Sequence, residues 1–207
     1  MNNIFKTYIA LAAIVVLLLS CKRQYTIEGD KVYYEYWNEG SGDNKKLLEG
    51  ADGKTFVPLK FDCDCEFMFG KDKRHLFIDG VPIKNIDPNS FVFIGNYIFK
   101  DKDSAYFFGF YNNINSCVIS GVDPNKIKLI QYPWAKADKI LMHGYDTIIL
   151  DDINDFIPIN EDWGKTKSKV LNRNEILFGA DAETFKVVNR YSGKDKNHTY
   201  EFGKIKE

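Results

Sequence analysis

The chain has 207 residues with 28 basic and 29 acidic side chains, so its net charge near −1 gives no reason to expect nucleic-acid binding. Aromatic residues make up 15%, with 12 Tyr and 16 Phe, and no long helical period stands out. Together with frequent Gly and Asn, this balance favours strands joined by tight turns.

The first 20 residues predict a secretory signal peptide. Lys6 supplies a positive start, and the apolar run from Tyr8 to Leu19 is shorter than the roughly 20 residues that cross a bilayer as a helix. The run ends in "LLSC", which resembles the lipobox of bacterial lipoproteins. An ordinary secretory signal with a chance cysteine is the alternative.

The lipobox resemblance implies that the chain is cut before Cys21, which then carries the lipid. Several acyl chains hold a protein firmly to a membrane, because each buried CH₂ contributes roughly 0.8 kcal/mol. We therefore expect a membrane-anchored lipoprotein of the bacterial cell envelope, with residues 21–29 as the tether. Lys22 stands where an aspartate retains some lipoproteins in the inner membrane, which favours the outer membrane in a cell that has one.

Residues 30–207 are predicted to form one repeat domain, since about 187 residues remain after the signal peptide. Its first segment contains Tyr33, Tyr34, Tyr36 and Trp37. Such a cluster either binds sugars or peptides or, more simply, packs in the core of an aromatic-rich β protein.

The segment "KFDCDCEFMF" reads as a strand with Cys63 and Cys65 on its aromatic face. Residues two apart on a strand are roughly 6.5–7 Å apart, whereas disulfide Cβ atoms lie about 3.8 Å apart. The cell envelope is oxidising, and Cys117 is the remaining mature thiol besides Cys21. We therefore predict a disulfide between Cys117 and either Cys63 or Cys65.

Two short motifs recur along the chain. The first is Asp, any three residues, then Phe or Ile, and its aspartates are Asp52, Asp87, Asp123, Asp152 and Asp181. The second is a charged turn motif centred on Asp30, Asp72, Asp101 and Asp195, with worn copies at Asp138 and Thr166. The spacing gives a base unit of about 29 residues, with insertions near 35–50, 60–70 and 106–120.

The stretch "SGKDKNHTYEF" at residues 192–202 carries the closest copy of the second motif, and the repeat there resembles the DKNYY family of bacterial proteins. "HTY" replaces the family's aromatic pair. The resemblance covers nearly the whole mature chain and implies a repeat architecture, with no activity to carry over.

Alternating residues on both sides of this motif predict a β-hairpin, with Asp195 accepting backbone N–H bonds in its turn. The first motif predicts a turn capped by its aspartate. The expected fold is all-β, made of tandem hairpin repeats in an open solenoid-like array. A propeller-like ring is the alternative, disfavoured because 29 residues are few for a four-stranded blade.

The chemistry-bearing residues are sparse. His75 and His198 follow motif aspartates in separate repeats, His143 stands elsewhere, and no GxSxG, HExxH or phosphate-loop pattern is present. We expect no catalytic residue, metal, cofactor or nucleic-acid partner. The predicted function is a non-enzymatic, lipid-anchored envelope protein with an interaction surface for an unknown protein or glycan. The alternatives are a glycan- or small-ligand-binding protein using exposed aromatics, and then a hydrolase.

Overall fold

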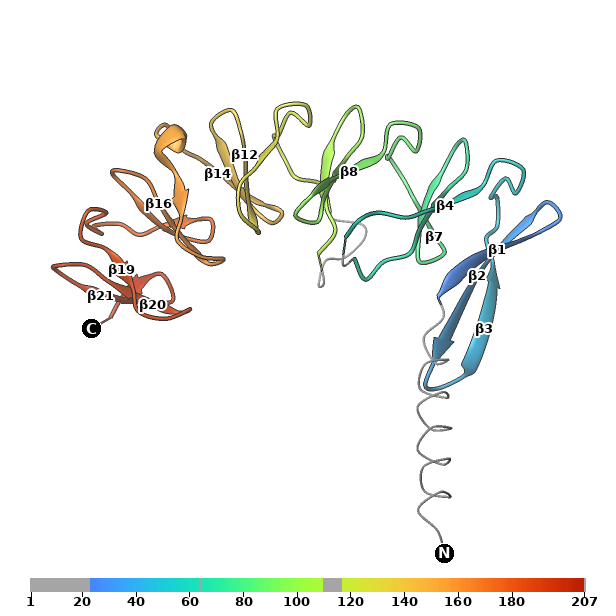
Figure 1. Ribbon diagram of the computed structural model, residues 1–207, viewed down its shortest axis with the longest axis horizontal. Helices are drawn as coiled ribbons and strands as arrows, with labels where there is room; N and C mark the ends of the chain where they lie inside the picture. The colour runs from blue at the N-terminus through green and yellow to red at the C-terminus, as the bar shows by residue number, and fades with distance from the viewer. Residues whose placement is uncertain (1–22, 64, 110–116, 207) are drawn as a thin grey trace, which may run out of the picture. The chain divides into compact units, whose positions relative to one another are not determined.

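The computed structural model describes residues 23–63, 65–109 and 117–206, which form six small antiparallel β-sheets (Figure 1). The predicted signal peptide and Cys21 lie outside the described residues. Within the described ranges there is no α-helix, only a 3₁₀ turn, η2 (Ile153–Asp155). The predicted all-β fold of tandem hairpin repeats is confirmed, and no described sheet closes into a barrel.

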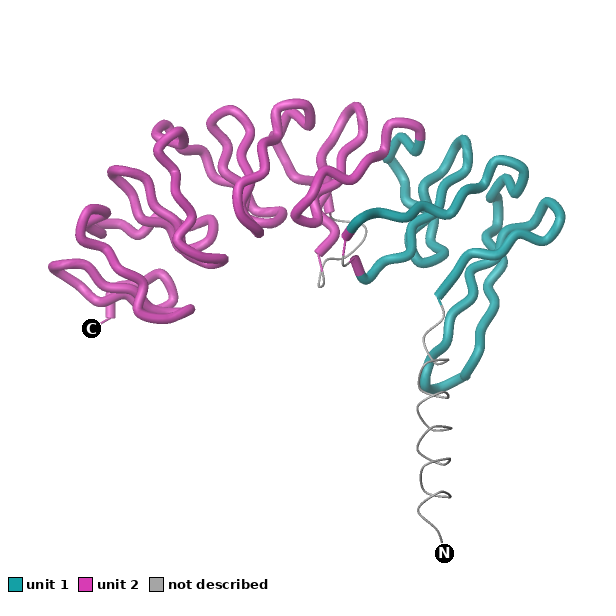
Figure 2. Tube along the Cα trace, in the orientation of Figure 1, with its two compact units in different colours: residues 1–62, 66–88 teal, residues 63–65, 89–207 magenta. Residues whose placement is uncertain are grey.

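The chain divides into two compact units, one of residues 1–62 and 66–88 and the other of residues 63–65 and 89–207 (Figure 2). The first unit holds two sheets, made of β1 (Gln24–Glu28), β2 (Lys31–Asn38) and β3 (Gly42–Leu47), and of β4 (Val57–Leu59), β5 (Phe69–Lys71), β6 (Leu76–Ile78) and β7 (Val81–Ile83).

The second unit holds four sheets. The first two contain β8 (Val92–Gly95), β9 (Ile98–Lys100) and β10 (Ala105–Phe107), and β11 (Lys128–Leu129), β12 (Trp134–Ala137), β13 (Ile140–His143) and β14 (Asp146–Ile149). The last two contain β15 (Ile157–Pro158), β16 (Trp163–Lys165), β17 (Val170–Asn172) and β18 (Glu175–Ile176), and β19 (Lys186–Val187), β20 (Ser192–Lys194), β21 (Thr199–Glu201) and β22 (Lys204–Ile205).

The second motif lies in the turn of the central hairpin of these sheets, as predicted. Asp72 joins β5 to β6, and Asp195 joins β20 to β21. Two flanking strands complete most sheets, however, where the sequence predicts only a hairpin. Strands of two or three residues are too short to show an alternating pattern. Because four strands fit within one repeat, the length argument against a propeller-like blade was wrong.

The apolar core is shared between consecutive repeats. Trp134 and Leu141 of one sheet pack in a cluster with Phe156 of the following turn and Leu171 of the next sheet. A cluster further along the chain joins Trp163, Val170, Phe185 and Tyr200 in the same way. Each repeat therefore buries its apolar face only with a neighbour, as expected for stacked units.

Two predicted boundaries need correction. Residues 24–28, assigned to the tether, form β1, which pairs with β2, so the folded domain begins before residue 30. The segment "KFDCDCEFMF" is not one strand, because β5 begins only at Phe69 and residues 61–63 and 65–68 are irregular. The first predicted insertion is the long β2–β3 hairpin.

The predicted disulfide to Cys117 also differs from the structure, in which Cys63 is joined to Cys65 with a Cα–Cα distance of 5.1 Å. The prediction failed because it assumed an extended strand, whereas this backbone bends and brings residues two apart together. Cys117 is buried, and burial raises the pKa of its thiol to about 11.

Candidate functional site

The motif aspartate holds the turn of the central hairpin. Asp195 Oδ1 accepts the backbone N–H groups of Asn197 and His198, both at 2.7 Å. The same pair of bonds, from residues two and three positions further on, recurs at Asp72, Asp101 and, through its hydroxyl oxygen, Thr166. A carboxylate oxygen that accepts two N–H groups fixes a tight turn without a glycine at its centre.

The second carboxylate oxygen joins the two motifs of a repeat. Asp195 Oδ2 accepts the backbone N–H of Asp181 at 2.7 Å and the hydroxyl of Tyr200 at 3.0 Å. Asp72 Oδ2 likewise accepts the N–H of Asp52 at 2.9 Å. Burial alone would raise the pKa of Asp195, but these hydrogen bonds hold it well below its usual range.

The residue before the motif phenylalanine also connects the two motifs of a repeat, although the first motif allows any residue at this position. In three repeats this residue is Ser or Thr, and its hydroxyl oxygen accepts the backbone N–H of the lysine after the motif aspartate at 3.0–3.3 Å. The pairs are Thr55 with Lys73, Ser90 with Lys102, and Thr184 with Lys196. In two repeats a charge pair replaces it, Lys126 with Asp138 at 2.7 Å and Asp155 with Lys167 at 3.0 Å. Asp138 lies 29 residues before Lys167, so it occupies the position after the motif residue and not the motif position predicted for it. The acid and the base exchange places between the two pairs. The contact between these two positions is therefore retained while the residue types differ.

The motif phenylalanine explains the glycine two residues before the motif aspartate or threonine. A Cβ added to Gly70 would lie 2.5 Å from the ring of Phe56. Gly164 and Gly193 are covered in the same way by the rings of Phe156 and Phe185. In these three repeats the glycine therefore makes room for the ring, whereas Phe99 stands at this position in the repeat of Asp101 and stacks on Phe91.

The lysines of the motif also have structural partners. Lys196 Nζ lies 2.7 Å from Asp181 Oδ2 in its own repeat. The lysine before the motif residue reaches forward to the next capped turn: Lys71 Nζ donates to Pro88 O at 2.8 Å, and Lys165 Nζ to Ala182 O at 3.1 Å. The charged residues of the second motif thus stabilise the repeat and its contact with the next one.

The other end of the sheets in the second unit has a different character. There, turns precede β12, β16 and β20 and also join the third strand of each sheet to the fourth. Their side chains line two adjoining pockets of about 400 and 270 Å³, which share Asp146, Asp162, Arg173 and Arg190. We call the two pockets together the Asp162 groove.

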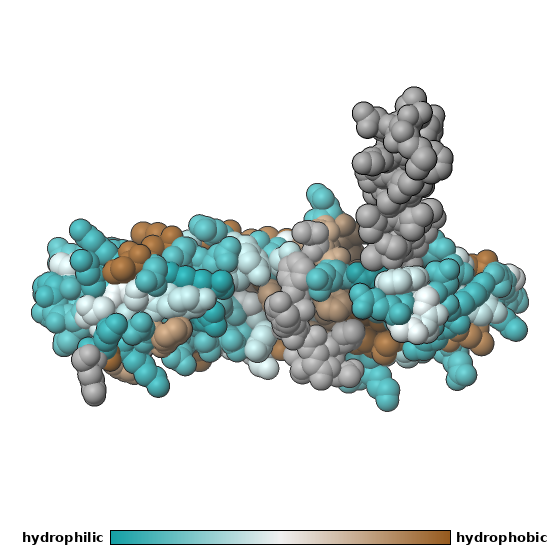
Figure 3. Space-filling model, turned by 90° about the horizontal axis from the view of Figure 1, so that it is seen from below, coloured by the Kyte–Doolittle hydropathy of each residue, from teal (hydrophilic) through white to brown (hydrophobic). Residues whose placement is uncertain are grey.

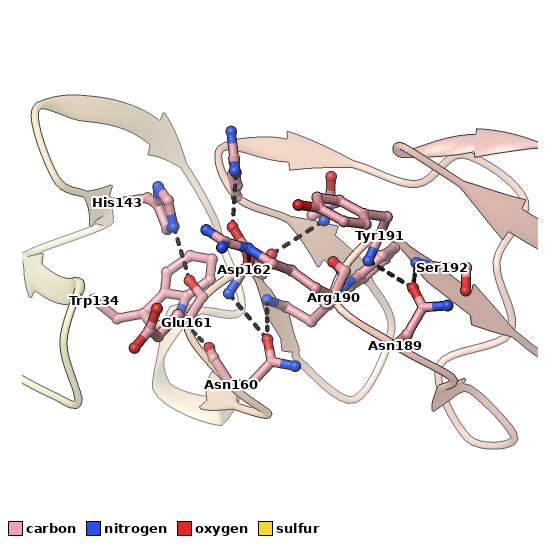
Figure 4. Close-up of polar contacts among 12 residues, drawn as sticks. Trp134, His143, Asn160, Glu161, Asp162, Asn189, Arg190, Tyr191 and Ser192 are labelled. Carbon is pink, nitrogen blue, oxygen red and sulfur yellow. Dashed lines mark hydrogen bonds and ion pairs between the residues drawn. The ribbon is translucent and has the colours of Figure 1, made fainter.

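A buried carboxylate organises the Asp162 groove (Figure 4). Asp162 is 7% exposed, and its two oxygens accept Nε–H of Arg173 and of Arg190, both at 2.9 Å. The arginines come from different sheets, so the carboxylate ties two repeats together. Both arginines bind through Nε, and no hydrogen bond from their terminal Nη groups occurs among the described residues.

Exposed aromatic rings stand at both ends of the groove. Tyr191 and Phe202, 50% and 65% exposed, line one pocket with their ring centroids 5.2 Å apart. Tyr132 and Tyr145 line the other pocket. Elsewhere, the face drawn in Figure 3 is largely hydrophilic, with hydrophobic residues in separate patches.

His143 reaches the groove, whereas the other two histidines lie beside motif turns. His143 Nε2 is 2.8 Å from Glu161 O, and its ring packs edge-on against Trp134 at 4.7 Å (Figure 4). Burial lowers its pKa, which favours the neutral ring. His75 Nδ1 lies 3.4 Å from Asp72 Oδ2, and His198 is exposed.

A sequence model of the DKNYY family matches residues 25–204, the span that contains every repeat described above. The chain belongs to the DKNYY family. No curated protein and no solved structure matches the chain. The DKNYY motif is therefore the turn-and-cap network described above, and the Asp162 groove lies at the opposite end of the DKNYY repeats.

The sequence did not lead us to predict the groove. A sequence signal for its turns is nevertheless present, because their residues recur at the 29-residue spacing of the repeat. Asn160 and Asn189, 29 positions apart, each accept the backbone N–H groups two and three residues further on at 2.8–2.9 Å. Gly144, Arg173 and Phe202, at the same spacing, have φ values of 63°, 54° and 49°. The turns are thus equivalent, and the DKNYY repeats differ in the side chains that these turns present.

Some predicted features do not contribute to the groove. Tyr34 is buried in the core of the first unit, while Trp37 is exposed on β2. No group of three or more potential metal-ligating side chains occurs among the described residues. Nor does any helix there have the length and apolarity to cross a membrane.

Proposed function

We propose that this DKNYY protein is a lipid-anchored component of the bacterial cell envelope that acts by binding, without catalysis, through the Asp162 groove. The predicted lipid is on Cys21, and the predicted site of action is the membrane surface, with the outer membrane favoured by Lys22. The partner is a protein or a glycan outside the membrane.

One observation carries the binding proposal: the two ends of the repeats use their polar residues differently. At the DKNYY motif, carboxylates such as Asp195 contact backbone groups of their own repeat. In the groove, aromatic rings are exposed, and the side chains of Arg173 and Arg190 are 53% and 61% exposed. Among the described residues its lining contains His143 and several carboxylates but no serine, threonine, cysteine or lysine, which disfavours a hydrolase with a hydroxyl, thiol or amine nucleophile of these types.

The anchoring is tested by substituting the predicted lipidated residue. The expected result is that the unaltered chain incorporates radiolabelled palmitate and sediments with membranes, whereas Cys21→Ser does neither. Cys117→Ser is the matched control and should still be labelled. Equal labelling of Cys21→Ser would contradict the proposed anchor.

The interaction surface is tested by placing a photo-crosslinking amino acid at Tyr145 or at Asp103 in living cells. Both positions are exposed, but Tyr145 lies in the groove and Asp103 in a DKNYY turn. We expect defined adducts from Tyr145 and none from Asp103. The same adduct pattern from both positions would argue against a role for the groove.

A further inference from the structure

We propose that the Asp162 groove binds a short stretch of an uncharged polysaccharide. This inference deepens the proposed function, because it names the ligand class of the same surface. It rests on the mixture of rings, donors and acceptors in the groove and on the charge of its lining.

The first argument is the placement of the rings. Tyr191 and Phe202 at one end, and Tyr145 at the other, are each at least half exposed. Covering an exposed aromatic surface with a ligand is favourable in water, and these rings gather in one groove. The flat face of a sugar ring carries C–H groups that pack on such rings, and two ring sites at opposite ends of one groove suit an elongated chain.

The second argument is the pairing of donors and acceptors. A sugar hydroxyl both donates and accepts, so it is best met by guanidinium groups next to carboxylates. The exposed side chains of Arg173 and Arg190 line the same pocket as the acceptors Asp146 and Glu175. Asp162 holds both guanidinium groups from behind, which fixes their planes before a ligand arrives and lowers the entropy cost of binding.

The third argument is charge, which narrows the ligand class. Two arginines and four carboxylates line the groove, namely Arg173, Arg190, Asp146, Glu161, Asp162 and Glu175. This excess of negative charge disfavours phosphate-rich or carboxylate-rich polymers. A cationic ligand would meet the two guanidinium groups, so an uncharged polyhydroxyl ligand fits best.

The test is affinity electrophoresis of the full chain in mild detergent, in gels that contain one soluble polysaccharide each. The uncharged probes are dextran, pullulan, galactomannan and xyloglucan, and the acidic probes are alginate and polygalacturonate. We expect retardation by at least one uncharged polymer, with no retardation by the acidic ones. Retardation by none of the uncharged polymers, or stronger retardation by the acidic ones, would overturn the inference.

Matched variants tie the retardation to the groove. Tyr191→Ala and Phe202→Ala should each weaken binding about tenfold, as for an aromatic residue central to an interface. Phe178→Ala removes a ring that is 86% exposed outside the groove, and should leave binding unchanged. Equal effects of Tyr191→Ala and Phe178→Ala would refute the assignment of the site.

The outcome can be separated from that of the proposed function. Defined adducts at Tyr145 in cells, combined with no retardation by any uncharged polysaccharide, would reject the sugar and keep the interaction surface. Retardation that depends on Tyr191, combined with soluble behaviour of the unaltered chain, would keep the sugar and reject the anchor.

Discussion

The two ends of the DKNYY repeats differ in what their polar residues contact. At the motif end, polar residues are half-buried or buried and contact the backbone of their own repeat, as Asp72 and Asp195 do. At the groove end, equivalent turns carry Gly144, Arg173 and Phe202, three chemically unlike residues in one backbone conformation. Repetition of a side chain therefore indicates a structural role, and variation in an equivalent turn indicates the surface available for function.

The largest effect is expected from removing a buried motif carboxylate. Asp72→Ala leaves the N–H groups of Asp52, Arg74 and His75 without their acceptor, which should lower the free energy of unfolding by about 2–4 kcal/mol. Urea denaturation measures this change. Asp103→Ala, in an exposed part of another motif turn, is the control and should change stability by less than about 0.5 kcal/mol. Equal losses in the two variants would contradict the distinction.

A smaller, pH-dependent effect is expected at Asp195. Its pKa is lowered in the folded chain, so its stabilisation is present above the unfolded value of about 3.9 and is lost as the pH falls through the folded value. Asp195→Asn replaces an acceptor of the Asp181 N–H by a donor, and should lower Tm by roughly 2–6 °C at pH 7. The gap from the unaltered chain should shrink toward pH 2. A gap that is constant with pH would show that the charge has no role.

A still smaller effect is expected from the charge pair at the position before the motif phenylalanine. It tests whether this position requires a contact with the motif turn and not a particular residue. Asp155→Lys or Lys167→Asp alone should lower Tm by roughly 1–3 °C, since each places like charges together. The double variant restores the pair with the polarity of Lys126 and Asp138, and should recover most of the loss. Additive losses in the double variant would refute this equivalence.

The smallest effect on stability is expected in the groove. Tyr191→Ala removes a half-exposed ring, and should change the free energy of unfolding by no more than about 0.5 kcal/mol, measured by urea denaturation. A loss comparable to that of Asp72→Ala would mean that the groove, too, is part of the framework.

Structural features that recur along the chain could be predicted from the sequence. Features that depend on which turns lie next to each other in the folded chain could not. The hairpin at Asp195 and the capped turn at Asp181 were predictable, because both are local and recur. The strands of two or three residues beside each hairpin were not, because they show no alternation. The Cys63–Cys65 bond was missed because the segment was assumed to be a strand, and the irregular backbone described at residues 61–63 and 65–68 has no compositional signal.

The groove was unpredictable for a related reason. Asp162, Arg173 and Arg190 belong to different strands and turns, and their contact exists only once two sheets are stacked. Glu161 and Arg190, at equivalent positions 29 residues apart, looked like ordinary surface charges. A comparison of the copies position by position would have singled out these turns as the places where the repeat tolerates most change.

The forward links between repeats have a consequence for what each joint requires of the neighbouring repeat. Lys71, Lys165, Trp134 and Trp163 all donate to backbone carbonyls of the following repeat, those of Pro88, Ala182, Asn160 and Arg190. A carbonyl is offered by every amino acid, so these four hydrogen bonds do not depend on which residue lies across the joint. The Asp162–Arg190 pair and the shared apolar clusters, by contrast, require matching side chains in the two repeats. One joint thus combines bonds that any neighbouring repeat could accept with contacts that only a matching neighbour can make.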